Sequence, residues 1–211
     1  MPGTVKTRLI AGIGRDRATA LYERLVLHTV RRVTESRLCP VELWCAPDTG
    51  HDLFRTCMLD FGTDLHVQVG ANLGERMLHA LSASIVRENP VVLLGCDCPS
   101  LTPIDIRNAF RILHGGHDAV IGPALDGGYY LLGLHEAAEA LFRGIPWGTD
   151  AVCEETCQRL SGLGRTIYQL GARRDLDTLE DYRAIRQSGE HDWLFEEASQ
   201  GRMETGLWRS G

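Results

Sequence analysis

The chain has 211 residues, a formal net charge of −6, 44% hydrophobic residues and 24% charged residues. This length and composition are typical of one globular α/β domain with a sizeable core. The acidic balance argues against a general nucleic-acid binder, which needs a net basic face. It still allows a nucleotide site that is supplied by a few local cations.

The sequence shows no sign of export or of a membrane span. Its apolar runs fall short of the ~20 residues that cross a bilayer, and its opening residues contain no hydrophobic signal core. Seven cysteines, an odd number, predict reduced thiols and a cytoplasmic location. The pairs Cys96/Cys98 and Cys153/Cys157 lack the second pair that a zinc site requires, so small buried thiols are expected.

Hydrophobic periodicity predicts the following elements in chain order: a loop (1–9), a helix (16–36), a strand (41–46), a helix (51–59), a strand (65–69), a helix (72–87), a strand (91–94), a helix (103–113), strands (119–121 and 129–134), helices (136–142 and 150–160), a strand (166–170) and a helix (178–186). The alternation indicates a layered α/β fold in a single domain, 1–211. Residues 189–211 form either a final helix or a peripheral tail.

The strand at 91–94 is a continuous apolar run, typical of a strand buried on both faces. Asp97 follows it almost at once, and Thr102-Pro103 has the form of a helix start. Open α/β sheets bind ligands at the carboxyl edge of their strands. Asp97 therefore either holds a divalent cation that bridges nucleotide phosphates, or only caps a turn.

Three further segments combine glycines with polar side chains. Gly3, Lys6 and Arg8 lie in an opening loop that suits a polyphosphate, or that forms a solvated basic terminus. In a second segment Asn72 could cap a helix, and Arg76 could face a base or phosphate. Gly74 costs stability in the first turn relative to alanine, which is explained either by a ligand that approaches closely or by a loose helix start. The third segment reads Asp126-Gly127-Gly128-Tyr129, which is either a ligand loop or a plain hairpin turn.

Two late segments add candidates. Trp147 precedes a helix that Thr149 or Asp150 can cap, and its ring could stack on a base or cover the core. Asp175 and Asp177 lie two residues apart on an extended segment, so they point the same way. They could complete an oxygen-ligand site for Mg²⁺, although Asp177 could instead cap the last helix.

Six segments together resemble one bacterial family. They read PGxxKTRL, NLGERM, VLLGCDCPSLT, DGGYYLLGL, IPWGTD and DLDTLED, and they span nearly the whole chain up to Arg186. The order resembles glycosyltransferase-A-like proteins, some of which are labelled glycosyltransferases of arsenosugar biosynthesis. These are relatives of the molybdopterin guanylyltransferases and phospholactate guanylyltransferases.

The resemblance implies a three-layer, Rossmann-like nucleotide-diphospho-sugar transferase fold with a mostly parallel central sheet. It further implies roles for residues that match the family's motifs. Phosphate binding falls to Gly3, Lys6 and Arg8, and the nucleotide also contacts Asn72, Gly74, Arg76 and Asp97. Mg²⁺ or Mn²⁺ is bound by Asp97 and Asp177, with Asp175 as a substitute, and the acceptor is bound by Asp126, Gly127, Gly128, Tyr129, Trp147 and Thr149.

One departure from the family concerns the first strand. Relatives begin with an apolar strand of ~5–6 residues before the Pro-Gly loop, whereas this chain starts at Met1-Pro2-Gly3. The loss would leave two neighbouring strands with unpaired backbone groups. We therefore expect either an upstream start of the natural chain, or a substitute strand from the C-terminal tail or a partner chain.

Three functions follow from these expectations. The first is metal-dependent glycosyl transfer from a nucleoside diphosphate sugar to a small-molecule acceptor, with Lys6 and Arg8 stabilising the diphosphate and Asp126 acting on an acceptor hydroxyl. The second is nucleotidyl transfer from a nucleoside triphosphate to a phosphorylated acceptor. The third is non-catalytic nucleotide binding. The sequence leaves the nucleobase, sugar, acceptor and stereochemistry open, and a homo-oligomer remains one option.

Overall fold

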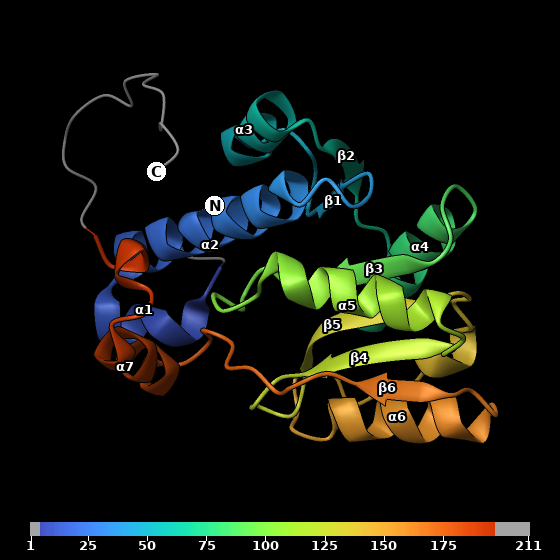
Figure 1. Ribbon diagram of the computed structural model, residues 1–211. Coiled ribbons are helices and arrows are strands. Elements are labelled where there is room, and N and C mark those ends of the chain that lie inside the picture. Colours follow the sequence, from blue (N-terminus) through green and yellow to red (C-terminus); the bar gives the residue numbers. More distant parts are fainter. Residues whose placement is uncertain (1–4, 197–211) are drawn as a thin grey trace.

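The structure is a computed structural model that describes residues 5–196 (Figure 1). Its elements are α1 (Thr7–Ile13), α2 (Arg15–Glu35), β1 (Glu42–Cys45), α3 (Asp52–Phe61), β2 (Asp64–Val67), α4 (Leu73–Ile85), β3 (Val91–Leu94), α5 (Pro103–His114), β4 (Ala119–Pro123), β5 (Tyr129–Leu134), η1 (Glu139–Leu141), α6 (Val152–Gly162), β6 (Ile167–Gln169), α7 (Leu179–Ser188) and η2 (Asp192–Leu194).

The strands form two small sheets. One has the order β3-β5-β4-β6, and the other pairs β1 with β2. Strand β5 is antiparallel to both of its neighbours, whereas β6 is parallel to β4 and β2 is parallel to β1. The expectation of a mostly parallel central sheet is therefore wrong. The Asp-Gly-Gly loop turns the chain back after β4, and β5 then inserts between β3 and β4.

The edge strands of the two sheets are β1, β2, β3 and β6. Strand β1 pairs only with β2, and β3 pairs only with β5, so no strand within residues 5–196 covers the other edge of either. All four residues of β3 are partly exposed, whereas Leu131–Leu134 of β5 are buried. The C-terminal tail, residues 189–211, was proposed as a substitute strand; its described part, residues 189–196, contains the short helix η2 and no strand, and residues 197–211 lie outside the described residues.

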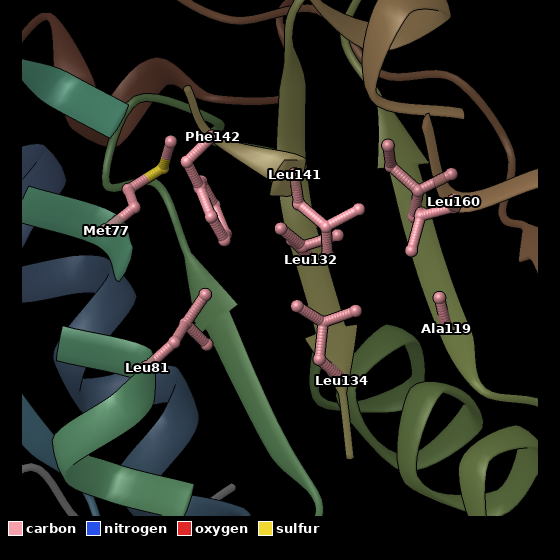
Figure 2. Packing of buried hydrophobic residues seen from close by; sticks show 9 residues of the cluster. Met77, Leu81, Ala119, Leu132, Leu134, Leu141, Phe142 and Leu160 are labelled. Atoms are coloured by element: carbon pink, nitrogen blue, oxygen red, sulfur yellow. The ribbon is translucent and has the colours of Figure 1, made fainter. Parts of the chain in front are cut away.

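Helices cover both faces of the four-stranded sheet and make three layers. Alternate residues of β4 and β5 point to opposite faces. On one face, Ala119 and Leu132 pack against Met77 of α4 and Leu160 of α6. Figure 2 shows this cluster, in which the Phe142 ring lies between Met77 and the leucines of the sheet. On the other face, α5 packs against Val120 and its neighbours.

The first and last helices pack together beside the sheet. Leu9 of α1 and Leu176 pack in one hydrophobic cluster with residues of α2, α7 and η2. Both leucines are fully buried. Gly12 lies close to α7: a Cβ there would lie 2.6 Å from Leu179 Cδ1, so a larger residue at this position would force that side chain to move. Helix α1 starts at Thr7, so the loop expected over residues 1–9 ends earlier than predicted. Gly14, at φ +85°, separates α1 from α2.

Most other expected elements are present, with ends shifted by a few residues. The exception is the helix expected over 136–142, of which only η1 forms. The expected final helix or tail is seen only in part, because residues 197–211 lie outside the described residues. Within the described part of the chain, no helix has both the length and the apolarity to cross a membrane.

Candidate active site

The loop after β3 places Asp97 at the edge of the sheet. The Gly95 N–H donates to the Tyr130 carbonyl at 3.0 Å, which extends the β3–β5 pairing by one residue. The chain then turns through Cys98 and Pro99 into α5. The Asp97 side chain is 39% exposed, but its Oδ1 atom is buried. One side of this carboxylate therefore faces the protein while the other is open to a ligand.

The segment after β6 brings a second and a third carboxylate to Asp97. The Leu176 N–H donates to the Asp97 carbonyl at 2.8 Å, and the Leu176 side chain is fully buried. Its neighbours Asp175 and Asp177 flank this anchor. The negative charge of Asp177 raises the pKa of Asp97, and the negative charge of Asp97 raises the pKa of Asp175. The three aspartates, here called the acidic cluster, thus come from two segments held together by one backbone hydrogen bond.

Lys6 lies between two members of the acidic cluster. Its Nζ atom is 2.6 Å from Asp97 Oδ1 and 2.6 Å from Asp177 Oδ1, and it donates a hydrogen bond to the latter. The Lys6 side chain is only 4% exposed. The packing of α1 on α7 fixes this position, because Lys6 directly precedes α1 and Asp177 precedes α7 by two residues.

The two arginines next to the cluster are engaged elsewhere. Arg173 donates to both carboxylate oxygens of Asp105 at 2.7 and 2.8 Å, and to the Ser100 carbonyl at 2.7 Å. Arg174 donates to Asp181 at 2.9 Å. These pairs tie the segment to the first turns of α5 and α7, so neither arginine neutralises the acidic cluster.

The pKa shifts follow from burial and crowding of charge. Burial raises the pKa of Asp175 to about 7, and the negative charges of three nearby aspartates add to the effect. Burial also raises the pKa of Asp97, which the Lys6 charge opposes. Burial alone would lower the pKa of Lys6, but the charges of Asp97 and Asp177 outweigh it and raise that pKa. The site therefore holds more negative charge than one lysine balances.

A pocket of about 230 Å³ opens on this group. It brings together four residues predicted from the sequence: Lys6, Arg8, Asp97 and Asp177. Among the described residues, its lining is Val5, Lys6, Thr7, Arg8, Tyr22, Asp97 and Asp177. A larger open hollow of about 610 Å³ lies along α4, but its lining is almost wholly apolar and contains no group of converging charges. We therefore place the candidate site at the smaller pocket.

Tyr22 is a pocket residue that the sequence did not indicate. It lies within α2, in a stretch whose helical spacing only predicted packing. Burial raises its pKa, with smaller contributions from the charges of Cys96 and Asp97. Its place in the pocket depends on where α2 crosses the sheet edge, so no local pattern could have revealed it. Gly3, predicted for the phosphate loop, lies outside the described residues.

The Asp126 loop forms a tight turn next to α6. The Gly128 N–H donates to Asp126 Oδ1 at 2.9 Å, and the Cys153 N–H donates to the Gly127 carbonyl at 2.8 Å. Gly127 has φ +88°, and a Cβ there would lie 2.1 Å from the Asp150 carbonyl oxygen. These glycines thus let the loop approach its own chain. The charge of Asp126 nevertheless raises the pKa values of Asp97 and Asp175.

The start of α4 is built from residues assigned to the nucleotide. Asn72 caps the helix by accepting from the Glu75 N–H at 3.0 Å. Gly74 lies under the indole of Trp147, where a Cβ would be 2.5 Å from the ring nitrogen. Arg76 donates to the Gly70 carbonyl at 3.1 Å. In this structure the close approach that Gly74 permits is made by a side chain of the protein itself.

The remaining acceptor candidates lie near the hydrophobic core. Tyr129 and Trp147 both pack on the cluster around Met77, and the Tyr129 hydroxyl is 3.9 Å from the Met77 sulfur. Thr149 is exposed, and its hydroxyl donates to the Pro146 carbonyl at 2.8 Å. None of these three side chains lines the pocket at Asp97. Their acceptor role stays a prediction.

The carboxylates of the site fit a divalent cation only in part. No group of three or more histidine, cysteine or acidic side chains in the described part of the chain is arranged to hold a metal as it stands. Two carboxylates nevertheless converge on one cation, and Asp175 Oδ1 is buried without a hydrogen-bond partner among residues 5–196. Mg²⁺ uses few carboxylates together with substrate phosphates, so Asp97 and Asp177 fit such an ion if Lys6 moves.

Comparisons with known proteins support the type of fold. A family profile described as "Uncharacterized protein conserved in bacteria (DUF2064)" matches residues 29–149. A crystal structure from Desulfovibrio desulfuricans G20, described as a candidate nucleotide-diphospho-sugar transferase, is 30% identical with a TM-score of 0.82. The match covers 94% of this chain and 87% of that one. No curated protein gives a significant match.

Two more distant structures share the fold alone. Rv0371c from Mycobacterium tuberculosis H37Rv is 16% identical, with a TM-score of 0.53 and coverage of 79% of this chain and 84% of that one. A CMP:2-keto-3-deoxy-manno-octonic acid synthetase complexed with CTP is 13% identical, with a TM-score of 0.52 and coverage of 84% and 90%. The α/β fold therefore resembles those of nucleotidyl and sugar transferases.

Proposed function

The chain belongs to this bacterial DUF2064 family, and we propose that it is a divalent-metal-dependent transferase acting on a nucleoside diphosphate sugar. The reaction is glycosyl transfer to a small-molecule acceptor. The bond between the anomeric carbon and the diphosphate oxygen breaks, a bond to the acceptor oxygen forms, and the acceptor hydroxyl loses its proton.

The observation that carries the proposal is the convergence of Asp97 and Asp177 on one cation beside a pocket that also contains Arg8. A structural ion pair needs one carboxylate per lysine, whereas this lysine has two at 2.6 Å and a third nearby. Carboxylates with neighbouring cations at the edge of an α/β sheet suit a metal-bound diphosphate.

The residues have distinct roles in this proposal. Asp97 and Asp177 hold Mg²⁺ or Mn²⁺, which when bound neutralises charge on the leaving diphosphate. Lys6 and Arg8 face the same pocket and stabilise the negative charge that develops there. Asp126, whose charge already acts on the acidic cluster, orients or deprotonates the acceptor hydroxyl. The aspartate keeps Oδ2 for this task, because Oδ1 accepts the Gly128 hydrogen bond.

A second candidate is nucleotidyl transfer from a nucleoside triphosphate to a phosphorylated acceptor. The observation that favours it concerns the described residues that line the pocket at Asp97. The carboxylates among them, Asp97 and Asp177, both contact Lys6, so these residues include no carboxylate base separate from the cation site. A phosphate acceptor is already anionic and needs no strong base. The same cations would then stabilise attack on the α-phosphate, and pyrophosphate would be released.

A thermal-shift panel of sugar nucleotides and nucleoside triphosphates, with and without Mn²⁺, tests binding first. A ligand at about a hundred times its dissociation constant should stabilise the protein by roughly 2.7 kcal/mol. That corresponds to about 5–10 °C for a domain of this size. Hits are then incubated with candidate acceptors, and the released products are identified.

The products separate the hypotheses. Nucleoside diphosphate released from a sugar nucleotide, and absent with Asp97→Asn, supports glycosyl transfer. Pyrophosphate from a triphosphate supports nucleotidyl transfer instead. Stabilisation by a nucleotide without turnover of any substrate would contradict both and leave a binding protein. An Asp97→Ala protein that keeps full metal-dependent nucleotide binding would overturn the assignment of the site.

A further inference from the structure

Lys6 occupies the point at which a divalent cation would contact the acidic cluster. Its ammonium lies 2.6 Å from one oxygen of each of Asp97 and Asp177. The contact with Asp177 is a directed hydrogen bond, whereas the Asp97 oxygen, although equally near, accepts none. The ammonium thus lies close to both carboxylates and leaves the buried Asp97 oxygen without a hydrogen bond, at the point that a cation of higher charge would occupy.

The charge balance also leaves room for a stronger cation. The cluster has three carboxylates, and Lys6 is the cation in direct contact with them among the salt bridges of the described residues. The neighbouring arginines are held by Asp105 and Asp181. One ammonium therefore leaves a net negative charge in a partly buried site, where unbalanced charge is costly.

The position of Lys6 allows its side chain to move to a ligand. The residue lies outside α1, in the left-handed conformation at φ 49°, and lines the pocket with Thr7 and Arg8. A lysine side chain has four rotatable bonds and a compact head, so the ammonium can move by several ångströms without movement of the helix. An anion that enters the pocket would meet Arg8 and Lys6 on the same wall.

We propose that Lys6 exchanges partners during ligand binding: its ammonium holds Asp97 and Asp177 together in the free protein, and it moves to the phosphates when a divalent cation takes the two carboxylates. The proposal rests on the proposed function and adds a binding order to it. The free metal ion competes with Lys6 and binds weakly. A metal-chelated polyphosphate supplies a new partner for the lysine and binds as a unit.

The test is the affinity for Mn²⁺ alone, measured by the loss of the free-ion electron paramagnetic resonance signal on titration with the full chain. Lys6→Met and Lys6→Gln remove the competing charge, and each should bind Mn²⁺ on the order of tenfold more tightly than the native protein. Lys6→Arg is the matched control, because it keeps the charge and should show no gain. The gain should vanish in Lys6→Met/Asp97→Asn if it arises at this site.

A second measurement uses inorganic pyrophosphate as the probe. In the native protein, pyrophosphate should tighten Mn²⁺ binding, and Mn²⁺ should tighten pyrophosphate binding by the same factor. This coupling should fall in Lys6→Met, because the lysine that links the two ligands is gone. Coupling of equal size in both proteins would overturn the exchange.

The sequence offers a direct probe of the lysine itself. Lys6 is the only lysine in the chain, so lysine-selective ¹³C labelling gives signals from this side chain alone. Its Cε resonance should shift when Mg²⁺ and pyrophosphate are added together. It should change much less with either one alone, and an unchanged signal on addition of both would contradict the proposal.

These outcomes are distinct from failure of the proposed function. Tighter Mn²⁺ binding by Lys6→Met, in a protein that turns over no sugar nucleotide, would support the exchange and reject glycosyl transfer. Turnover by the native protein, combined with no gain of Mn²⁺ affinity in Lys6→Met and Lys6→Gln, would overturn the exchange and leave the transferase proposal standing.

Discussion

Two groups of aspartates lie at adjacent places in the fold and differ in how fully they are paired. Asp105 and Asp181 each occupy the first turn of a helix, where each accepts hydrogen bonds from the preceding threonine and from an arginine. The acidic cluster has three carboxylates around Lys6, and two of its buried oxygens, Asp97 Oδ1 and Asp175 Oδ1, have no hydrogen-bond partner among the described residues.

The pKa values reflect the same difference. Burial tends to raise the pKa of Asp181, but hydrogen bonds from Thr178 and Arg174 outweigh it and lower that pKa. Burial raises the pKa of Asp175 to about 7, with no hydrogen bond to oppose it. The paired aspartates stabilise the fold. The under-paired ones are held in place by it at a cost to stability, as is typical of binding and catalytic sites.

The largest expected effect is loss of function without loss of stability on changing Asp97. Asp97→Asn should lower turnover of the substrate found in the panel on the order of 10³-fold, equivalent to about 4 kcal/mol. Its free energy of unfolding should change by less than about 1 kcal/mol, since Lys6 keeps Asp177 as a partner. Steady-state kinetics and urea unfolding measure the two quantities. A strongly destabilised variant would place Asp97 with the structural aspartates.

The converse is expected for Asp105. Asp105→Ala removes the capping bonds of α5 and leaves the Arg173 guanidinium, only 26% exposed, without its carboxylate. The free energy of unfolding should fall by about 3 kcal/mol, and the melting temperature by roughly 6–12 °C. Calorimetry checks the shift. A loss below about 1 kcal/mol would remove the distinction between the two groups.

Asp175 should make stability depend on pH. Its pKa is raised from an ordinary 3.8 to about 7, so the folded state binds the proton more tightly than the unfolded state. Its contribution to stability is therefore complete below about pH 4 and is lost as the pH rises to about 7. Across this window the native protein should lose about 2 kcal/mol relative to Asp175→Asn, after allowance for partial exposure. Denaturant unfolding at several pH values gives the difference, and parallel curves for the two proteins would contradict it.

The smallest effect is expected at Arg174. Its side chain is 39% exposed, and Asp181 keeps the Thr178 bonds when the arginine is removed. Arg174→Ala should thus cost only about 0.5–1 kcal/mol, less than a third of the Asp105→Ala effect. Urea unfolding of the two variants side by side measures the ratio, and equal losses would show that the capping bonds at Asp181 matter less than its arginine.

Local patterns singled out the parts of the site that lie in short motifs. The strand end at Asp97 and the extended segment at Asp177 each marked a candidate ligand or a cap, and the family resemblance assigned both residues to one metal site. The structure places both carboxylates beside Lys6, and their role as metal ligands stays a prediction. These positions are set by strand ends and helix starts, which leave clear sequence signals. Strand β5 was also predicted with its observed limits, because its apolar run directly follows the glycine pair.

The features that the sequence did not predict depend on tertiary packing. Helix α1 follows a proline- and glycine-containing loop and is stabilised by the contact of Leu9 and Gly12 with other helices. The alanine-rich segment 136–142 has good helix propensity, yet it forms only one short turn, and its Leu141 and Phe142 are buried in the core cluster around Met77. The insertion of β5 between β3 and β4 is a matter of strand order, on which local periodicity carries no information.

The central claim is that the acidic cluster and Lys6 form a site for a metal-bound polyphosphate. A crystal structure with Mn²⁺ and pyrophosphate tests it most directly, because manganese is located by its anomalous signal. The account predicts one manganese peak coordinated by Asp97 and Asp177, with the Lys6 ammonium moved to a phosphate oxygen. Manganese bound elsewhere, with Lys6 still between the two carboxylates, would contradict it.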